Sequence, residues 1–341
     1  MINFNKLIKT TRLLSWSFLA ISMFVAEQVA AQTTKLTLHL DQQGIKISPQ
    51  LYGLMTEEIN YSYDGGLYAE LIRNRSFKDN PRKPEHWALA DHNSSSFISL
   101  DRSHPVNEAL SMSLQLHIAA DDKNAALVND GFWGIPVKPA TNYQGSFYAM
   151  AANENSGPLT VAIEDSVSHK IYASVSVNGV GNGWKKFTYT LTTGAGIPAT
   201  SATRFVIRPS QAGDYWFTLV SLFPPTYNNR PNGNRSDMME LLNSMHPHFL
   251  RMPGGNYLEG DMFSRRFNWK NTLGPLEDRP GHRGPWGYYS SDGFGLLEFL
   301  EWCEDLHMEP VLAVFAGSRS MAIILTPVRF WNLLCRMPCR K

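Results

Sequence analysis

The sequence predicts a multi-domain protein in which a partial (β/α)8 TIM barrel carries an inserted β-sandwich of the jelly-roll kind. Helix and strand patterns alternate over residues 226–317, as at the start of a barrel. Residues 81–225 consist of short alternating segments separated by Gly, Asn and Ser turns, without a convincing helical pattern. A strand pattern that ends in polar residues precedes this insert, at residues 51–60.

Composition favours a soluble globular protein. The chain has 341 residues, enough for one large domain or two ordinary ones, a hydrophobic share of 43% and a formal charge of +1. The near-neutral charge argues against a nucleic-acid binder. Aromatic residues make up 12% of the chain and include nine Trp. Sugar sites use such rings as flat platforms, although most rings belong to protein cores.

The N-terminus has the pattern of a secretory signal peptide over residues 1–31. Lys6, Lys9 and Arg12 precede an apolar run over residues 13–26, and small residues at 29–31 mark a cleavage point. The run is shorter than the roughly 20 residues that a membrane span needs. We therefore expect a secreted or periplasmic protein, with no membrane attachment after the signal is cleaved.

Residues 32–80 are expected to form an N-terminal strand and the first βα unit of the barrel. Leu36, Leu38 and Leu40 alternate with polar residues, which predicts a strand. A second, buried strand ends at Glu57 and Glu58. Burying two adjacent carboxylates is costly. Glu57 and Glu58 are therefore either plain surface charges, or one of them faces a site. A helix is expected over residues 67–75, after a glycine pair.

The insert at residues 81–225 is expected to be a carbohydrate-binding-like β-sandwich. Its predicted strands cover residues 112–118, 143–151, 160–164, 185–191, 203–209 and 216–222. Its aromatic residues are a candidate stacking face, but we expect core packing rather than binding for most of them. They are Trp133, Tyr143, Trp184, Tyr189 and Trp216.

The barrel pattern resumes over residues 226–317. A helix capped by Ser236 and Asp237 leads to a strand that ends at Arg251, and the turn that follows it begins with Pro253 and contains Asn256. A long aromatic-rich loop, a helix over residues 292–302 and a buried strand over residues 311–315 complete this segment. Ligands of parallel α/β folds bind at the carboxyl ends of strands, so we expect a polar pocket there.

Several strings resemble α-L-arabinofuranosidases of glycoside hydrolase family 51, over residues 35–317. They are residues 52–60 (YGLMTEEIN), 65–75 (GGLYAELIRNR), 251–260 (RMPGGNYLEG), 269–270 (WK), 274–277 (GPLE), 279–282 (RPGH) and 297–315. The insert resembles the carbohydrate-binding-module-like domain of one branch of the family. The resemblance implies a retaining exo-glycosidase on a (β/α)8 barrel that a C-terminal β-sandwich follows. It would remove terminal α-L-arabinofuranosyl groups from arabinan, arabinoxylan or their oligosaccharides.

The resemblance also implies roles for three substrate-binding residues. Glu57 and Asn256 would bind furanose hydroxyls, and Arg251 would orient a catalytic carboxylate. Retaining chemistry needs two carboxyl groups about 5 Å apart. The family has both as glutamates on later strands, the first within an Asn-Glu pair. The pairs Asn107-Glu108 and Asn153-Glu154 lie in the insert, the wrong domain, so no catalytic acid/base or nucleophile is assigned in this chain.

The tail at residues 318–341 departs from the family pattern. Back-translated and read two nucleotides later, residues 327–341 give an amphipathic helix that resembles the family. We therefore interpret the tail as the product of a frameshift between Gly317 and Thr326. The polypeptide as written is expected to be truncated before its catalytic glutamates and hydrolytically inactive.

Two other functions stay open at this point. A secreted carbohydrate-binding protein would use only the sandwich, and a related glycosidase would act on another furanoside or on xylosides. The ten His form no ligand-spaced cluster, and no phosphate-binding glycine loop is present, so no metal and no cofactor is expected. Cys303, Cys335 and Cys339 imply no disulfide framework.

Overall fold

The computed structural model describes residues 35–41, 43–93, 95–122, 124–154 and 156–317. It divides into two compact units, residues 1–47 and residues 48–341. The predicted signal peptide over residues 1–31 and the predicted out-of-frame tail over residues 318–341 lie outside the described residues. Among the described helices, none has the length and apolar character needed to cross a membrane.

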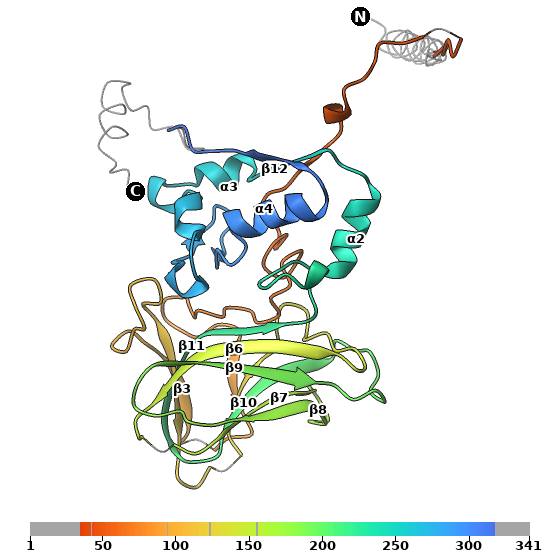
Figure 1. Cartoon of the computed structure of the whole chain (residues 1–341). Coiled ribbons are helices and arrows are strands. Elements are labelled where there is room, and N and C mark those ends of the chain that lie inside the picture. The colour runs from red at the N-terminus through yellow and green to blue at the C-terminus, as the bar shows by residue number, and fades with distance from the viewer. Residues whose placement is uncertain (1–34, 42, 94, 123, 155, 318–341) are drawn as a thin grey trace, which may run out of the picture. The chain divides into compact units, whose positions relative to one another are not determined.

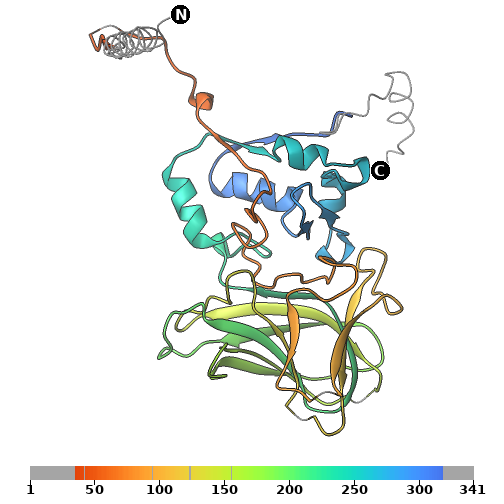
Figure 2. The ribbon, with the colours of Figure 1, turned by 180° about the vertical axis from the view of Figure 1, so that it is seen from behind.

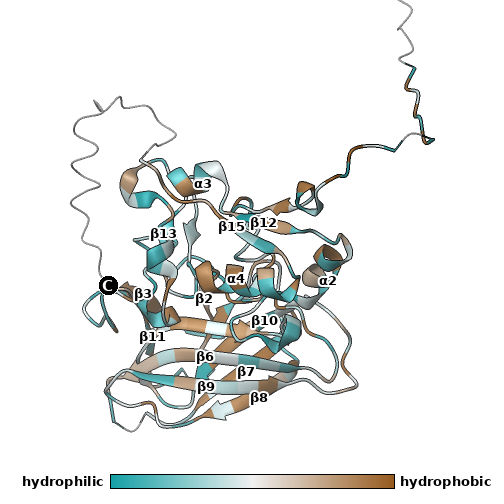
Figure 3. Cartoon of the chain, turned by 45° about the horizontal axis from the view of Figure 1, so that its top comes forward, coloured by the Kyte–Doolittle hydropathy of each residue, from teal (hydrophilic) through white to brown (hydrophobic). Residues whose placement is uncertain are grey.

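The described part of the first unit is extended and exposed. Hydrophobic and hydrophilic residues alternate along it (Figure 3), and the side chains of Leu36, Leu38 and Leu40 are largely exposed. No helix or strand forms in residues 35–41 and 43–47, so the predicted N-terminal strand is wrong for this structure. An extended segment becomes a strand only when a neighbour supplies its hydrogen bonds, and alternation alone does not supply one.

The second unit contains a three-stranded parallel sheet in the order β1-β12-β15 (Figure 1). Its strands are β1 (Leu54–Met55), β12 (Phe249–Met252) and β15 (Glu309–Leu312). Helix α2 (Ser236–Ser244) precedes β12, and the short helix α3 (Gly255–Glu259) and the longer α4 (Leu296–Asp305) follow it. The sheet does not close on itself within the described residues, so a complete (β/α)8 barrel stays a prediction.

Helix α4 packs against the parallel strands because its apolar residues recur on one face. Phe299, Trp302 and Cys303 are buried and share a hydrophobic cluster with Leu250 and Met252 of β12. A side chain three or four residues along a helix lies on the same face, which produces this stripe. The cluster therefore fixes which face of β12 points towards the helices and which points away from them.

Strands β2 to β11 form two five-stranded antiparallel sheets that lie face to face (Figures 1 and 2). We call residues 87–223 the two-sheet region. One sheet has the order β2-β5-β10-β7-β8 and the other β3-β4-β11-β6-β9. The strands are β2 (Trp87–Ala90), β3 (Phe97–Asp101), β4 (Ser113–Ile118), β5 (Ala126–Asn129), β6 (Asn142–Ala151), β7 (Leu159–Asp165), β8 (Ile171–Val177), β9 (Lys185–Thr192), β10 (Thr203–Pro209) and β11 (Gly213–Phe223).

One hydrophobic core lies between the two sheets. Its members include Leu114 of β4, Phe147 of β6 and Phe217 of β11 from one sheet, and Val161 of β7 and Phe205 of β10 from the other. All six strands predicted over residues 112–222 are confirmed, within a few residues at their ends. Strands β2, β3, β5 and β8 were not predicted.

Other sequence predictions need correction. Residues 67–75 form turns rather than a helix. The carboxylate of Glu70 accepts hydrogen bonds from the amides of Ile72 and Leu222, and this tertiary arrangement replaces helical bonding. The last predicted strand is not buried, because β15 lies at an edge of the sheet and leaves Val311 43% exposed. Neither Ser236 nor Asp237 caps α2; its N-cap is Arg235, without a side-chain cap bond.

The long loop between α3 and α4 is built from short elements. It contains the 3₁₀ helices η3 (Phe263–Arg265), η4 (Trp269–Thr272) and η5 (Leu276–Asp278), and a small antiparallel pair of strands, β13 (His282–Arg283) and β14 (Tyr289–Ser290). Two further 3₁₀ helices, η1 (Pro49–Leu51) and η2 (Tyr227–Asn229), lie before β1 and after β11. The loop places Tyr288 beside the carboxyl end of β1, as described below.

Candidate active site

Two parallel strands end at the same edge of the three-stranded sheet. Met55 of β1 pairs with Arg251 of β12, and the amide of Thr56 donates to the carbonyl of Arg251 at 2.9 Å. The polar residues that follow each strand therefore gather at one edge, where α/β proteins hold ligands. The structure brings the Glu57 and Arg251 segments side by side; the roles assigned to them from the sequence stay predictions.

The carboxylate of Glu57 is held against the turn after β12. Its Oε1 accepts a hydrogen bond from the amide of Tyr257 at 2.8 Å. Its Oε2 lies so close to Gly254 that a Cβ there would stand only 2.2 Å away. A side chain at position 254 would displace the carboxylate, so the glycine is required for the close approach of the two loops.

The other two candidate residues point away from the core. Leu250 and Met252 are buried against the helices, and side chains alternate along a strand, so Arg251 lies on the opposite face. Its guanidinium is half-buried and makes no hydrogen bond to any described residue. Asn256 is exposed on α3, one residue before the amide that binds Glu57. These groups leave donors and acceptors available at the strand ends.

Glu57 and Glu58 have opposite environments. Glu58 is buried, with its Oε1 accepting from the hydroxyl of Tyr288 at 2.9 Å and its Oε2 from the amide of Tyr63 at 2.6 Å. Burial, and secondarily the carboxylate of Asp64, raises the pKa of Glu58 to about 8. At neutral pH Glu58 is therefore mainly a neutral acid of the scaffold, whereas Glu57 faces the strand-end edge.

Tyr288 joins the long loop to this site, and the sequence analysis did not identify it. Its ring stacks on Tyr61 with centroids 4.2 Å apart, and its hydroxyl accepts from the amide of Tyr61 at 3.1 Å. Arg73 donates to the hydroxyl of Tyr61 at 3.0 Å. The high aromatic content of the loop was the only signal in the sequence, and it does not distinguish one Tyr from another.

The two Asn-Glu pairs of the sequence belong to the two-sheet region. Glu108 and Glu154, each preceded by Asn, are exposed in the two-sheet region. The Asn107 side chain is bound to the segment of η5, because its amide donates to the carbonyl of Glu277 at 3.0 Å. Retention requires a pair of carboxyl groups about 5 Å apart on either side of the bond that breaks. No acid/base or nucleophile is therefore assigned among the described residues.

One cluster in the two-sheet region has ligand types suited to a metal. Asp91, Glu164 and His169 bring one ligand atom each within 4.8 Å of one another, a grouping that the sequence analysis did not foresee. Arg204 donates to Glu164 at 2.7 Å, and Arg208 lies 3.5 Å from Asp91. These two cations already compensate the carboxylates, so the cluster is an ion-pair network as it stands.

The candidate stacking residues separate into two groups. Tyr143, Tyr189 and Trp216 are buried. Tyr143 and Tyr189 belong to the core between the two sheets, which confirms core packing for them. Trp216 is not part of that core, and its Nε1 donates to Asp101 at 2.6 Å. Trp184 is partly exposed, and the Trp133 side chain is 72% exposed. Trp133 is thus the member of this set that packing does not explain.

Known proteins resemble this chain over most of its length. The family model of the alpha-L-arabinofuranosidase 1 domain matches residues 241–327. The probable alpha-L-arabinofuranosidase A of Aspergillus terreus is 37% identical over 279 residues, 80% of this chain and 44% of the relative. Alpha-L-arabinofuranosidase 1 of Arabidopsis thaliana is 31% identical over 320 residues, 86% of this chain and 46% of the relative.

A solved structure of an α-L-arabinofuranosidase is also similar to this chain. The arabinose-bound MgGH51 α-L-arabinofuranosidase shares 38% identity and a TM-score of 0.73, covering 80% of this chain and 45% of that one. The chain resembles the N-terminal part of the family 51 α-L-arabinofuranosidases. It spans less than half the length of the curated relatives it matches.

Proposed function

We propose that this sequence supplies the sugar-binding edge of a retaining exo-α-L-arabinofuranosidase. The enzyme removes terminal α-L-arabinofuranosyl groups from arabinan or arabinoxylan. The observation that carries the proposal is the meeting of Glu57 with the turn after β12, where Tyr257 fixes the carboxylate. The similarity to arabinofuranosidases over 80% of the chain supports the same substrate class.

Each residue at the edge has a distinct role in this proposal. The Glu57 carboxylate and the Asn256 amide bind hydroxyls of the furanose ring. Arg251 carries a guanidinium on the face away from the helices, and it orients a catalytic carboxylate, because an arginine fork fits a carboxylate by two parallel hydrogen bonds. Glu58 holds the loop of Tyr288 in place without contacting the sugar.

The proposal extends to the architecture. The three parallel strands begin a (β/α)8 TIM barrel, and residues 81–225 are an inserted β-sandwich with a jelly-roll arrangement. The protein is secreted or periplasmic after removal of residues 1–31. In this proposal the chain as written is inactive, because neither of the two carboxyl groups that retention needs is assigned among its described residues.

Enzyme assays on two forms of the gene test the proposal. The codons for residues 316–341 and the sequence beyond them are resequenced, and both the chain as written and any longer frame are expressed. We expect only the longer form to release arabinose from arabinan, arabinoxylan and 4-nitrophenyl α-L-arabinofuranoside. In that form, Glu57→Ala should lower kcat/KM by about 100-fold, because it removes contacts to the reacting sugar.

The matched control is Glu108→Ala, which removes an exposed carboxylate from the two-sheet region. Its kcat/KM should equal that of the unmodified longer form. Hydrolysis by the chain as written would contradict the assignment of inactivity. Unchanged kcat/KM in Glu57→Ala would refute the assignment of the sugar-binding edge.

A further inference from the structure

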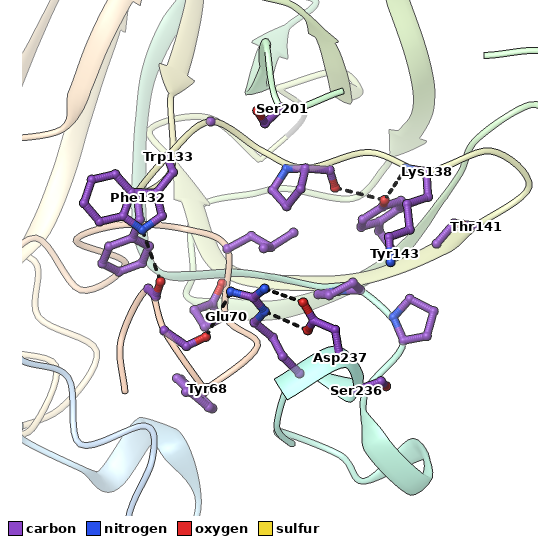
Figure 4. Close-up of a pocket in the computed structure, with 18 residues that line it drawn as sticks. Tyr68, Glu70, Phe132, Trp133, Lys138, Thr141, Tyr143, Ser201, Ser236 and Asp237 are labelled. Atoms are coloured by element: carbon purple, nitrogen blue, oxygen red, sulfur yellow. Dashed lines mark hydrogen bonds and ion pairs between the residues drawn. The ribbon is translucent and has the colours of Figure 1, made fainter. Parts of the chain in front are cut away.

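A cleft lies between the turns at residues 65–71 and the two-sheet region (Figure 4). It has a volume of about 460 Å³, which is within the range of small-molecule sites, roughly 300–1,000 Å³. Glu57, Arg251 and Asn256 are not among its lining residues. The cleft is therefore separate from the strand-end edge described above.

One wall of this cleft is a fixed aromatic platform. The Trp133 side chain is 72% exposed, yet its indole Nε1 donates to the carbonyl of Gly65 at 3.3 Å. Phe132 also lines the cleft, and a Cβ on Gly65 would meet its ring at 2.4 Å. Gly65 adopts a φ of +88° and has no side chain, so the turn can approach the rings. An exposed Trp that is held in one orientation is preorganised to stack on a flat apolar partner.

The other side of the cleft presents hydrogen-bonding groups. Figure 4 shows Asp237 and Ser236 across the cleft from Trp133, with Lys138 and Thr141 on the two-sheet region. Arg235 donates to both carboxylate oxygens of Asp237, at 3.0 and 2.6 Å. The Asp237 side chain is 59% exposed, so its remaining lone pairs can accept from a ligand.

We propose that this cleft binds a short pentose oligosaccharide from the plant-wall polymers that carry arabinose. A sugar ring has an apolar face of C–H groups, which stacks on Trp133, and a rim of hydroxyls, which the Asp237 carboxylate and the Lys138 ammonium bind. The charges of Arg235 and Asp237 compensate each other, so the polar wall carries little net charge beyond that of Lys138, which suits a neutral sugar. The cleft would hold a chain of the polymer while the strand-end edge receives a terminal residue.

Calorimetric titration of the full chain tests this site with two probes, arabinohexaose and xylohexaose. The two arms distinguish an arabinan source from a xylan source. Trp133→Ala should weaken binding of the preferred probe by roughly tenfold or more, since truncation of a central aromatic contact has effects of that size. Trp133→Phe should retain part of the affinity, because it keeps a ring at the platform.

Two control variants separate this cleft from other surfaces. Phe97→Ala removes a 47% exposed ring elsewhere on the two-sheet region, and Glu108→Ala removes an exposed carboxylate from it. Both should leave the affinity unchanged. Circular dichroism confirms that each variant is folded. If the unmodified chain binds neither probe, the proposal is overturned. Equal binding by Trp133→Ala, or a loss of affinity in Phe97→Ala or Glu108→Ala, also overturns it.

Discussion

Arg279 anchors the long loop to α4, and its replacement provides the sharpest test of the packing described above. Its guanidinium makes five hydrogen bonds, one from Nε, three from Nη1 and one from Nη2. Nε donates to the carbonyl of Gly274, Nη1 to the carbonyls of Asp292 and Gly293 and to Glu298 Oε2, and Nη2 to Glu298 Oε1, at 2.9–3.2 Å. The side chains of Arg279 and Glu298 are only 3% and 4% exposed.

The cost of Arg279→Met follows from the charge that it leaves behind. Removing one partner of a buried ion pair typically costs about 3–5 kcal/mol of unfolding free energy. The Glu298 carboxylate would keep two donors, the amide of Gly295 at 2.9 Å and the Asn232 side chain at 2.7 Å. We therefore expect a loss of about 3 kcal/mol, at the low end of that range. Arg279→Lys keeps the positive charge but not the planar guanidinium with its several N–H donors, and its unfolding free energy should fall by about 1–2 kcal/mol.

Urea unfolding, followed by tryptophan fluorescence, measures these losses. The double variant Arg279→Met/Glu298→Gln should recover about half of the single loss, because the uncompensated charge is gone. Lys83→Met is the control, since its ion pair with Glu85 spans 3.7 Å and the Lys83 side chain is 71% exposed. If Arg279→Met stays within about 1 kcal/mol of the unmodified chain, the buried pair does not anchor the loop and the reasoning fails.

Three further predictions follow from single side chains. In the longer enzyme, Gly254→Ala should displace the Glu57 carboxylate and lower kcat/KM by about tenfold, whereas Gly255→Ala, which meets nothing within 4 Å, should not; equal rates would contradict the contact. Glu58 has a folded pKa of about 8, above its unfolded value, so the folded state holds the extra proton. The unfolding free energy should therefore fall as the pH rises from 4.5 to 8, by at most about 1.4 kcal/mol per pH unit from this group. In Glu58→Gln the urea midpoint of unfolding should depend less on pH across that range. Burial raises the pKa of Cys303 to about 12, so iodoacetamide at pH 8 should modify it only after unfolding, and rapid native modification would refute the burial.

Strands with one polar and one apolar side could be predicted from the sequence. In β9, buried residues alternate with exposed ones over Lys185–Thr192, and this alternation is visible in the residue types. In β5, all four residues of Ala126–Asn129 are buried, so no alternation exists to detect. The turns at residues 67–75 had an apolar pattern that resembled a helix. Buried contacts of Glu70 across the fold decide their conformation instead.

The candidate site could also be predicted only in part from residue patterns. The pattern of a strand followed by polar residues located Glu57 and Arg251, because parallel strands align their carboxyl ends. It could not separate Glu57 from its neighbour Glu58, since the difference lies in burial and in Tyr288, which is 230 residues away. Sequence reasoning also left Trp133 among the core candidates, because exposure of a ring depends on which segments pack over it.

Backbone hydrogen bonds join the segment that leads into the two-sheet region to the last strand of that region. The amide of Leu71 donates to the carbonyl of Leu222, and the amide of Val220 donates to the carbonyl of Arg75, each at 2.9 Å. The two ends of the region are therefore adjacent, and a loop of any length can close across them at little extra entropic cost. Loops inside the region can lengthen, shorten or be exchanged during evolution without moving the strand ends that carry Glu57 and Arg251.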